Sequence, residues 1–261
     1  MLNIIISLSF ICIIYFVIRL FFFKDLNPLN HAIFLSGSIF AFSMILLILF
    51  DKSTIDPQLY CNLPLFFFNM DFGNLTLFLN QSKVYILQEC GIDGLSIFFV
   101  LLSTFLIFLC LIEVWNYNAS FPKIKEFIIY FFILEFFLIL AFVTLDLLVF
   151  YIFFESVLIP MFLIIGIWGS RERKIKANFY FFIYTLLGSI FMLITIFIIF
   201  FEAYSTKYFV IYNIFFNFDK EWLLLLFSFL AFSVKIPMFP FHIWLPEAHV
   251  EAERNLNNIW L

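Results

Sequence analysis

Three charged residues lie deep inside long apolar runs of this sequence. Glu135 stands in FIIYFFILEFFLILAF, Glu155 in FYIFFESVLIPM and Lys235 in LLLLFSFLAFSVKIP. A charged side chain near the centre of a bilayer costs at least about 2.5–3.5 kcal/mol, so such residues face a partner or a wet cavity. A carboxylate and an ammonium that are held together in an apolar site can relay protons, because the charge of each controls the proton affinity of the other.

Glu155 and Lys235 form the pair that we expect to carry this chemistry. Pro237 and Pro240 follow the lysine. They cannot donate backbone hydrogen bonds, so they predict a helix break directly after it. A broken helix at membrane depth is tolerated only where it is buried in protein or lines a wet cavity. We therefore predict an ion pair that relays protons. An ion pair that only fixes helix packing is the alternative.

Glu135 is a possible additional member of the relay. It lies 11 residues before Asp146, and Glu155 lies 9 residues after Asp146. Two antiparallel helices joined near Asp146 would place both carboxylates at a similar depth. A pairing of Glu135 with a neighbouring helix, without any role in proton transfer, is an equal alternative.

His242 and His249 follow the predicted break in KIPMFPFHIWLPEAHVEAE. Histidine titrates near neutrality, so we expect both residues to extend the relay from Lys235. Hydrogen bonds that hold the broken helix are the alternative. Because prolines interrupt the segment, no helical face presents both histidines, and we expect no metal site. The cysteines have no CxxC spacing, which argues against a metal or iron–sulfur site; they are Cys12, Cys61, Cys90 and Cys110.

The composition identifies the kind of fold that must hold these residues. The chain has 261 residues, of which 65% are hydrophobic and 12% charged. A soluble domain carries roughly 25% charged residues, and a transmembrane β-barrel shows alternating segments of about 10 residues. The apolar runs here are long enough for membrane-spanning helices, which need about 20 residues. We predict an all-α, polytopic transmembrane bundle of about seven spans, near 3–23, 31–50, 95–115, 127–145, 147–168, 178–201 and 222–236.

Basic residues predict how the bundle is oriented. Alternate loops divide into one set with eight Lys and Arg residues and another with four. The densest cluster lies in the 169–177 loop, and such loops face the cytoplasm or the mitochondrial matrix. The 45 phenylalanines suggest an A+T-rich genome, as in many mitochondria. We therefore expect a multi-pass membrane protein with the 169–177 loop on the cytoplasm-like side, which is the matrix side if the protein lies in the mitochondrial inner membrane.

Four runs of sequence resemble a known family. They are GIDGLSIFFVLLSTFLIFLCL, then LDLLVFYIFFESVLIPMFLIIGIWGSRERKI with YFFIYTLLGSIFMLI after it, and KIPMFPFHIWLPEAHVEA. Together they resemble the antiporter-like, proton-translocating membrane subunits of respiratory complex I. The resemblance is close over about 91–252, whereas 1–90 matches only in helix pattern. We therefore divide the chain into N-terminal helices with a surface segment (1–90) and an antiporter-like region (91–261).

The resemblance implies a function and assigns residues to it. It implies proton pumping driven by quinone reduction elsewhere in the complex, with Glu155 as the partner of Lys235 and with His242 and His249 at the two histidine positions of the family. The chain would then be a subunit of a proton-translocating NADH:ubiquinone reductase that carries no redox centre. NADH, FMN, iron–sulfur clusters and ubiquinone are expected in other subunits. A component of a stand-alone cation/proton antiporter is the alternative, and a piece that only fills the membrane arm is a third possibility.

The resemblance also implies partners. The family has about 14 helices in two inverted repeats, and this sequence covers the first repeat incompletely before EAERNLNNIWL replaces the family pattern. We expect other membrane-arm subunits of complex I as partners, with a separate chain supplying the C-terminal half. We also expect lipids, with cardiolipin as one candidate, and no nucleic acid.

Overall fold

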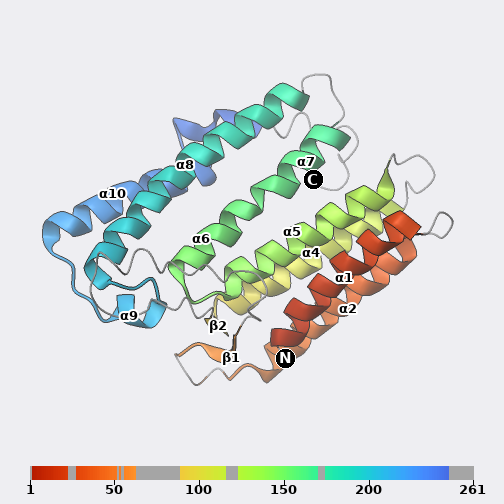
Figure 1. Ribbon diagram of the computed structural model, residues 1–261, viewed down its shortest axis with the longest axis horizontal. Coiled ribbons are helices and arrows are strands. Elements are labelled where there is room, and N and C mark those ends of the chain that lie inside the picture. The colour runs from red at the N-terminus through yellow and green to blue at the C-terminus, as the bar shows by residue number, and fades with distance from the viewer. Residues whose placement is uncertain are drawn as a thin grey trace.

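The fold is almost entirely helical over the residues that the computed structural model describes, which are 2–22, 28–51, 53, 56–62, 89–115, 123–169 and 174–246. A single two-stranded sheet lies at one end of the described bundle (Figure 1). The longer helices are α1 (Leu2–Phe22), α2 (Pro28–Leu49), α4 (Ser96–Trp115), α5 (Ile124–Val143), α6 (Leu147–Ser156), α7 (Leu158–Trp168), α8 (Lys174–Ala203) and α10 (Phe218–Lys235). Two short helices, α9 (Tyr208–Tyr212) and the 3₁₀ turn η1 (Phe241–Ile243), complete the set.

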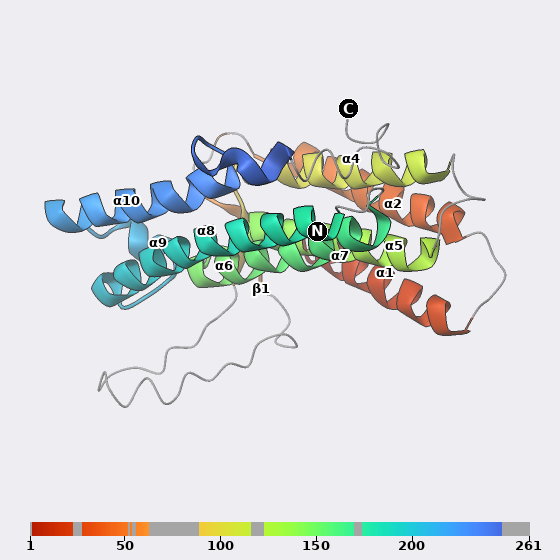
Figure 2. The same ribbon diagram turned by 90° about the horizontal axis from the view of Figure 1, so that it is seen from above.

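The helices form two neighbouring groups. In the first, α1 packs on α5, α2 packs on α4, and α4 packs on α5. In the second, α8 packs against α6 and α7, and α10 runs along α8 (Figures 1 and 2). Aromatic rings fill the α1–α5 contact, as in the stacked pair Phe16 and Phe132 with centroids 5.3 Å apart. The helices before residue 90 thus pack directly on those after it.

Five helical stretches are long and apolar enough to cross a membrane: Pro28–Leu49, Ser96–Val114, Ile124–Val143, Leu147–Trp168 and Lys174–Ala203. A shorter apolar stretch, Ile4–Ile18, lies within α1. The helix α10 carries Asp219, Lys220, Glu221 and Lys235 along its 18 residues and does not qualify by composition. The polytopic helical class is therefore confirmed, while the count of seven spans stays a prediction.

The predicted span 147–168 is interrupted where Glu155 stands. α6 ends at Ser156 and α7 begins at Leu158. Pro160 has no N–H, so the carbonyl of Ser156 loses its usual donor four residues on. The hydroxyl of Ser156 donates to the carbonyl oxygen of Ile152 at 2.7 Å, an arrangement that often bends helices. The interruption leaves Glu155 in the last turn of α6.

The two-stranded sheet is a feature that the all-α prediction missed. Strands β1 (Gln58–Asn62) and β2 (Glu89–Ile92) pair antiparallel, with Cys61 opposite Cys90. An isolated bridge joins Cys90 to Thr144, so the sheet is attached to the turn between α5 and α6. Strands of four and five residues carry little periodicity against an apolar background, which explains the omission.

Asp146 fixes the start of α6. It is almost fully buried, and its Oδ1 accepts hydrogen bonds from the backbone N–H groups of Leu148 at 2.9 Å and Val149 at 3.2 Å. Its Oδ2 accepts a hydrogen bond from the hydroxyl of Thr206 at 2.8 Å. One carboxylate therefore caps α6 and ties it to the chain that follows α8.

Replacing Asp146 with alanine is expected to lower stability by about 1–3 kcal/mol, since a lost N-cap costs about 0.5–2 kcal/mol and the Thr206 hydroxyl also loses its acceptor. Thermal unfolding of the purified, detergent-solubilised assembly would measure the loss. Asp146→Asn keeps a capping side chain and should cost much less. Asp93→Ala removes only the exposed cap of α4 and is the control; equal losses for Asp93→Ala and Asp146→Ala would contradict the prediction.

Candidate functional site

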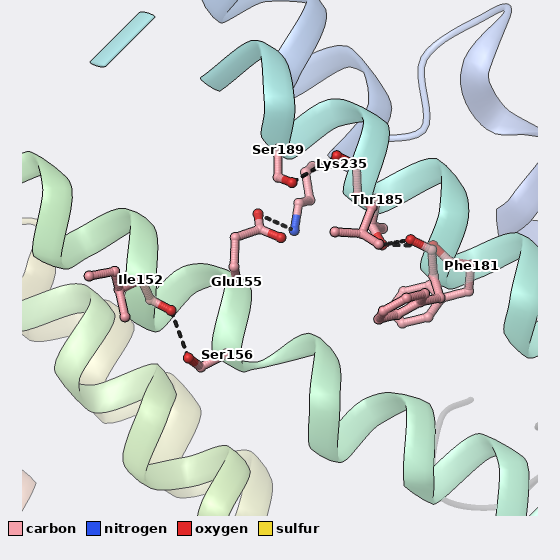
Figure 3. A network of polar contacts seen from close by, with 9 residues as sticks. Ile152, Glu155, Ser156, Phe181, Thr185, Ser189 and Lys235 are labelled. Carbon is pink, nitrogen blue, oxygen red and sulfur yellow. Dashed lines mark hydrogen bonds and ion pairs between the residues drawn. The ribbon is translucent and has the colours of Figure 1, made fainter. Parts of the chain in front are cut away.

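The structure contains the ion pair that the sequence predicted. Lys235 Nζ lies 3.2 Å from Glu155 Oε1, and each side chain is only 16% exposed (Figure 3). Glu155 comes from the last turn of α6 and Lys235 from the last turn of α10. Two residues that are 80 positions apart in the sequence are therefore in direct contact inside the second group of helices.

Gly188 of α8 allows α10 to come close enough for this contact. A Cβ atom at position 188 would lie 3.0 Å from Cβ of Val234 and 3.2 Å from the carbonyl oxygen of Ala231. Small residues at helix contacts in membranes let backbones approach in this way. Because Val234 immediately precedes Lys235, the close contact at Gly188 fixes the position of the lysine backbone relative to α8.

An aromatic ring and the C-terminal end of a helix also stabilise the charge of Lys235. The Nζ atom lies 4.3 Å from the ring centroid of Phe154, within the range of a cation–π interaction. A cation in the last turn of a helix is further favoured by the helix dipole. Both oxygens of Glu155 are shielded from solvent, and among the described residues neither receives a well-directed hydrogen bond. Attraction to Lys235 is therefore the main interaction that compensates this carboxylate.

The predicted helix break follows Lys235 directly. α10 ends at Lys235, and Pro237 and Pro240 lie in the irregular stretch after it. The backbone N–H of Met238 donates to Ser233 O at 2.9 Å, in place of the donor that Pro237 lacks.

Trp244 anchors the chain beyond the break. Its ring N–H donates to the carbonyl oxygen of Val234 at 3.0 Å, which satisfies one of the orphan carbonyls at the end of α10. The ring is buried against Phe181 of α8, with centroids 5.3 Å apart. The segment after the break is therefore held against both helices next to the ion pair.

Sequence reasoning missed a stripe of polar residues on α8. Asn178, Thr185 and Ser189 are all buried, and Figure 3 shows Thr185 and Ser189 beside the ion pair. The two hydroxyls donate to carbonyl oxygens of their own helix, Thr185 to Phe181 at 2.7 Å and Ser189 to Leu186 at 2.8 Å. Their spacing of seven and four residues is that of one helix face, so the pattern was present in the sequence.

Glu135 is not joined to this site by any hydrogen bond or ion pair among the described residues. Its side chain is 0% exposed, and neither carboxylate oxygen has a described hydrogen-bond partner. It lies close enough to Cys12 of α1 to act on that thiol electrostatically. Its role in a relay therefore stays a prediction.

The structure does not connect either predicted histidine to the ion pair. His242 is exposed, its ring is 5.8 Å from that of Phe239, and within the described chain no hydrogen bond or ion pair links it to Lys235. His249 lies outside the described residues, as do Arg171 and Arg173 of the 169–177 loop. Among the residues that the structure describes, no group of three His, Cys, Asp or Glu side chains is placed to hold a metal ion.

The ion pair lies in a part of the chain that matches known proteins. Residues 144–255, which include Glu155 and Lys235, match the NADH:quinone oxidoreductase/Mrp antiporter transmembrane family. The chain is similar to NADH-ubiquinone oxidoreductase chain 4 of several organisms. It is 47% identical to that protein of Arabidopsis thaliana over 82% of this chain, and 57% identical to that of Marchantia polymorpha over 62% of this chain.

A solved structure of respiratory complex I from Thermus thermophilus with bound NADH contains a chain of the same fold. The TM-score is 0.74 at 24% sequence identity, over 96% of this chain and 47% of that one. The alignments cover 40% of the Arabidopsis protein and 32% of the Marchantia protein. The chain therefore spans less than half the length of these relatives.

Proposed function

We propose that this chain is part of a membrane-arm subunit of respiratory complex I and takes part in proton translocation coupled to NADH oxidation and ubiquinone reduction. The buried ion pair of Glu155 and Lys235, placed at a helix break, is the observation that carries the proposal. Two similarities support the proposal. The ion pair lies inside the region that matches the family, and the chain is 47% and 57% identical to chain 4 of two plants.

The ion pair can transfer protons when its two charges separate. While Lys235 touches Glu155, each buried charge is compensated. When the lysine moves away, both charges are uncompensated, and burial of an unpaired charge is costly. Uptake of a proton by Glu155 or release of one by Lys235 removes that cost. The flexible four-carbon stem of Lys235 allows such a movement, and His242 and His249 are proposed to receive or deliver protons beyond it.

The redox chemistry is assigned to other subunits. NADH, FMN, iron–sulfur clusters and ubiquinone are proposed to bind elsewhere in the complex, and this chain would supply no redox centre. The scattered cysteines support this assignment, because iron–sulfur clusters are held by sets of closely spaced cysteines. In the same proposal, residues 91–261 form the proton-translocating region and residues 1–90 support it.

The same proposal places the chain in the mitochondrial inner membrane, with the 169–177 loop on the matrix side. Lys174 and Lys176 at the start of α8 support this orientation. The proposed partners are other membrane-arm subunits and lipids, including cardiolipin. The helices that complete the proton path are proposed to pack along α8 and α10, where large apolar side chains such as Leu225 and Phe229 are exposed. Lipid in that position within the assembled complex would contradict this arrangement.

Affinity purification through this chain, from detergent-solubilised membranes, tests the proposal. We expect a large assembly that contains flavin and iron–sulfur clusters and reduces quinone with NADH. A component of a stand-alone cation/proton antiporter would instead purify in a small assembly without flavin, and would exchange sodium for protons in vesicles. Isolation of that small assembly would overturn the complex I proposal.

A further inference from the structure

Ser189 stands beside the carboxylate that the proposed mechanism leaves without a partner. Its side chain is 2% exposed, and its hydroxyl lies beside the carboxylate of Glu155 (Figure 3). The same hydroxyl adjoins the phenol of Tyr151. Tyr151 and Glu155 are one turn apart on α6, and α8 packs on that helix. Two neutral hydroxyl groups therefore flank Glu155 on the side that faces α8.

While Lys235 is in place, the hydroxyl of Ser189 donates to its own helix and also lies within hydrogen-bonding reach of Glu155. It donates to the carbonyl oxygen of Leu186 at 2.8 Å, a carbonyl that also accepts within the helix. A serine hydroxyl rotates freely and carries one proton that it can direct to either acceptor. The carboxylate, with no well-directed hydrogen bond among the described residues, is a vacant acceptor within reach.

The need for a second donor arises when the ion pair opens. A buried carboxylate without any donor is strongly disfavoured, and a single hydrogen bond to a charged group is among the stronger ones. Lys235 of α10 is the charged group that faces Glu155. Glu135 of α5, the helix on the other side, forms no ion pair or hydrogen bond with Glu155 among the described residues. Within the described chain, hydroxyls are thus the groups left to stabilise Glu155 once the lysine withdraws.

We infer that Ser189 is a positioning residue that turns its hydroxyl from Leu186 to Glu155 when Lys235 leaves the ion pair. The hydroxyl keeps its own proton throughout, and it holds the carboxylate in place for the next proton or for the return of the lysine. Tyr151, one turn before Glu155 on α6, is a second hydroxyl that can stabilise the carboxylate when Lys235 is absent. This inference rests on the proposed function of the Glu155–Lys235 pair.

The test compares Ser189→Ala, Ser189→Thr and Ser103→Ala in the assembled complex, in sealed membrane vesicles that pump protons with NADH. Ser103 is a matched control because it is also buried and donates to the carbonyl three residues earlier, at 2.9 Å, but lies in α4 away from the pair. Ser189→Ala should slow pumping about tenfold. The midpoint of the pH profile should move to higher pH, because loss of a donor disfavours the charged carboxylate.

Ser189→Thr keeps the hydroxyl and should retain most of the rate, and Ser103→Ala should pump normally. An infrared band of the protonated Glu155 carboxyl, assigned by its loss in Glu155→Gln, should shift in Ser189→Ala but not in Ser103→Ala. Equal rates and profiles for the two alanine variants would overturn the inference, and so would equal slowing of Ser189→Ala and Ser189→Thr without a shift of pH profile or band. If Glu155→Gln itself pumps normally, the proposed function has failed instead.

Discussion

Replacing Lys235 with alanine is expected to reduce proton pumping to near background, while the complex still assembles. The change removes the ammonium of the ion pair and leaves Glu155 buried without its main compensating interaction. Truncating one partner of a buried ion pair costs about 3–5 kcal/mol, so Glu155 is expected to take up a proton and stay neutral. A permanently neutral site cannot cycle between charge states. NADH-driven proton uptake by sealed vesicles, measured together with NADH oxidation, would detect the loss.

Lys220 offers a matched control for this experiment. It also lies on α10 and forms an ion pair with a carboxylate of α8, Glu202, but that pair is at the exposed end of the helix. Exposed ion pairs contribute only about 0–1 kcal/mol, so Lys220→Ala should pump normally. If Lys235→Ala pumps as well as Lys220→Ala, the chain only fills the membrane arm and the ion pair only fixes helix packing.

Enlarging Gly188 is expected to have the second largest effect. A valine at this position would push its side chain into Val234 and into the backbone of Ala231, neither of which can yield without moving α10. Overpacking of this kind costs about 1–3 kcal/mol, and here it also displaces Lys235 from Glu155. We expect Gly188→Val to lower the amount of assembled complex and to abolish pumping in what remains, with Gly188→Ala intermediate. Native gels and vesicle pumping assays would measure the two effects.

Gly94 provides the comparison for Gly188. A Cβ atom there would meet only the ring of Phe50, at an ordinary contact distance of 3.9 Å. Gly94→Ala should therefore assemble and pump as the unchanged chain does. Normal pumping by Gly188→Val would show that the close contact of α8 and α10 does not control the ion pair.

The sequence by itself determined the class of protein and identified the charged residues inside the membrane-spanning segments. A membrane-spanning helix has a required length and tolerates few charges, so apolar runs of about 20 residues can be read directly. For the same reason Glu155 and Lys235 were conspicuous, and prolines marked the break after the lysine. The spans predicted from residue 95 onward correspond to α4, α5, the α6–α7 pair, α8 and α10.

The tertiary structure alone decided which faces of these helices meet. Counting residues from Asp146 gave the depth of Glu135 but not its surroundings, which bury it completely in a helix that packs on α1. The interruption of the fifth span at Ser156 depends on a local contact, which hydrophobic periodicity does not reveal. The pairing of the two β-strands depends on residues far apart in the sequence, which periodicity does not reveal either. Above all, α8 packs on both α6 and α10, and its close approach to α10 at Gly188 depends on side-chain packing. Hydropathy identifies a helix, but its rotation and neighbours are set by side-chain packing between segments far apart in the chain.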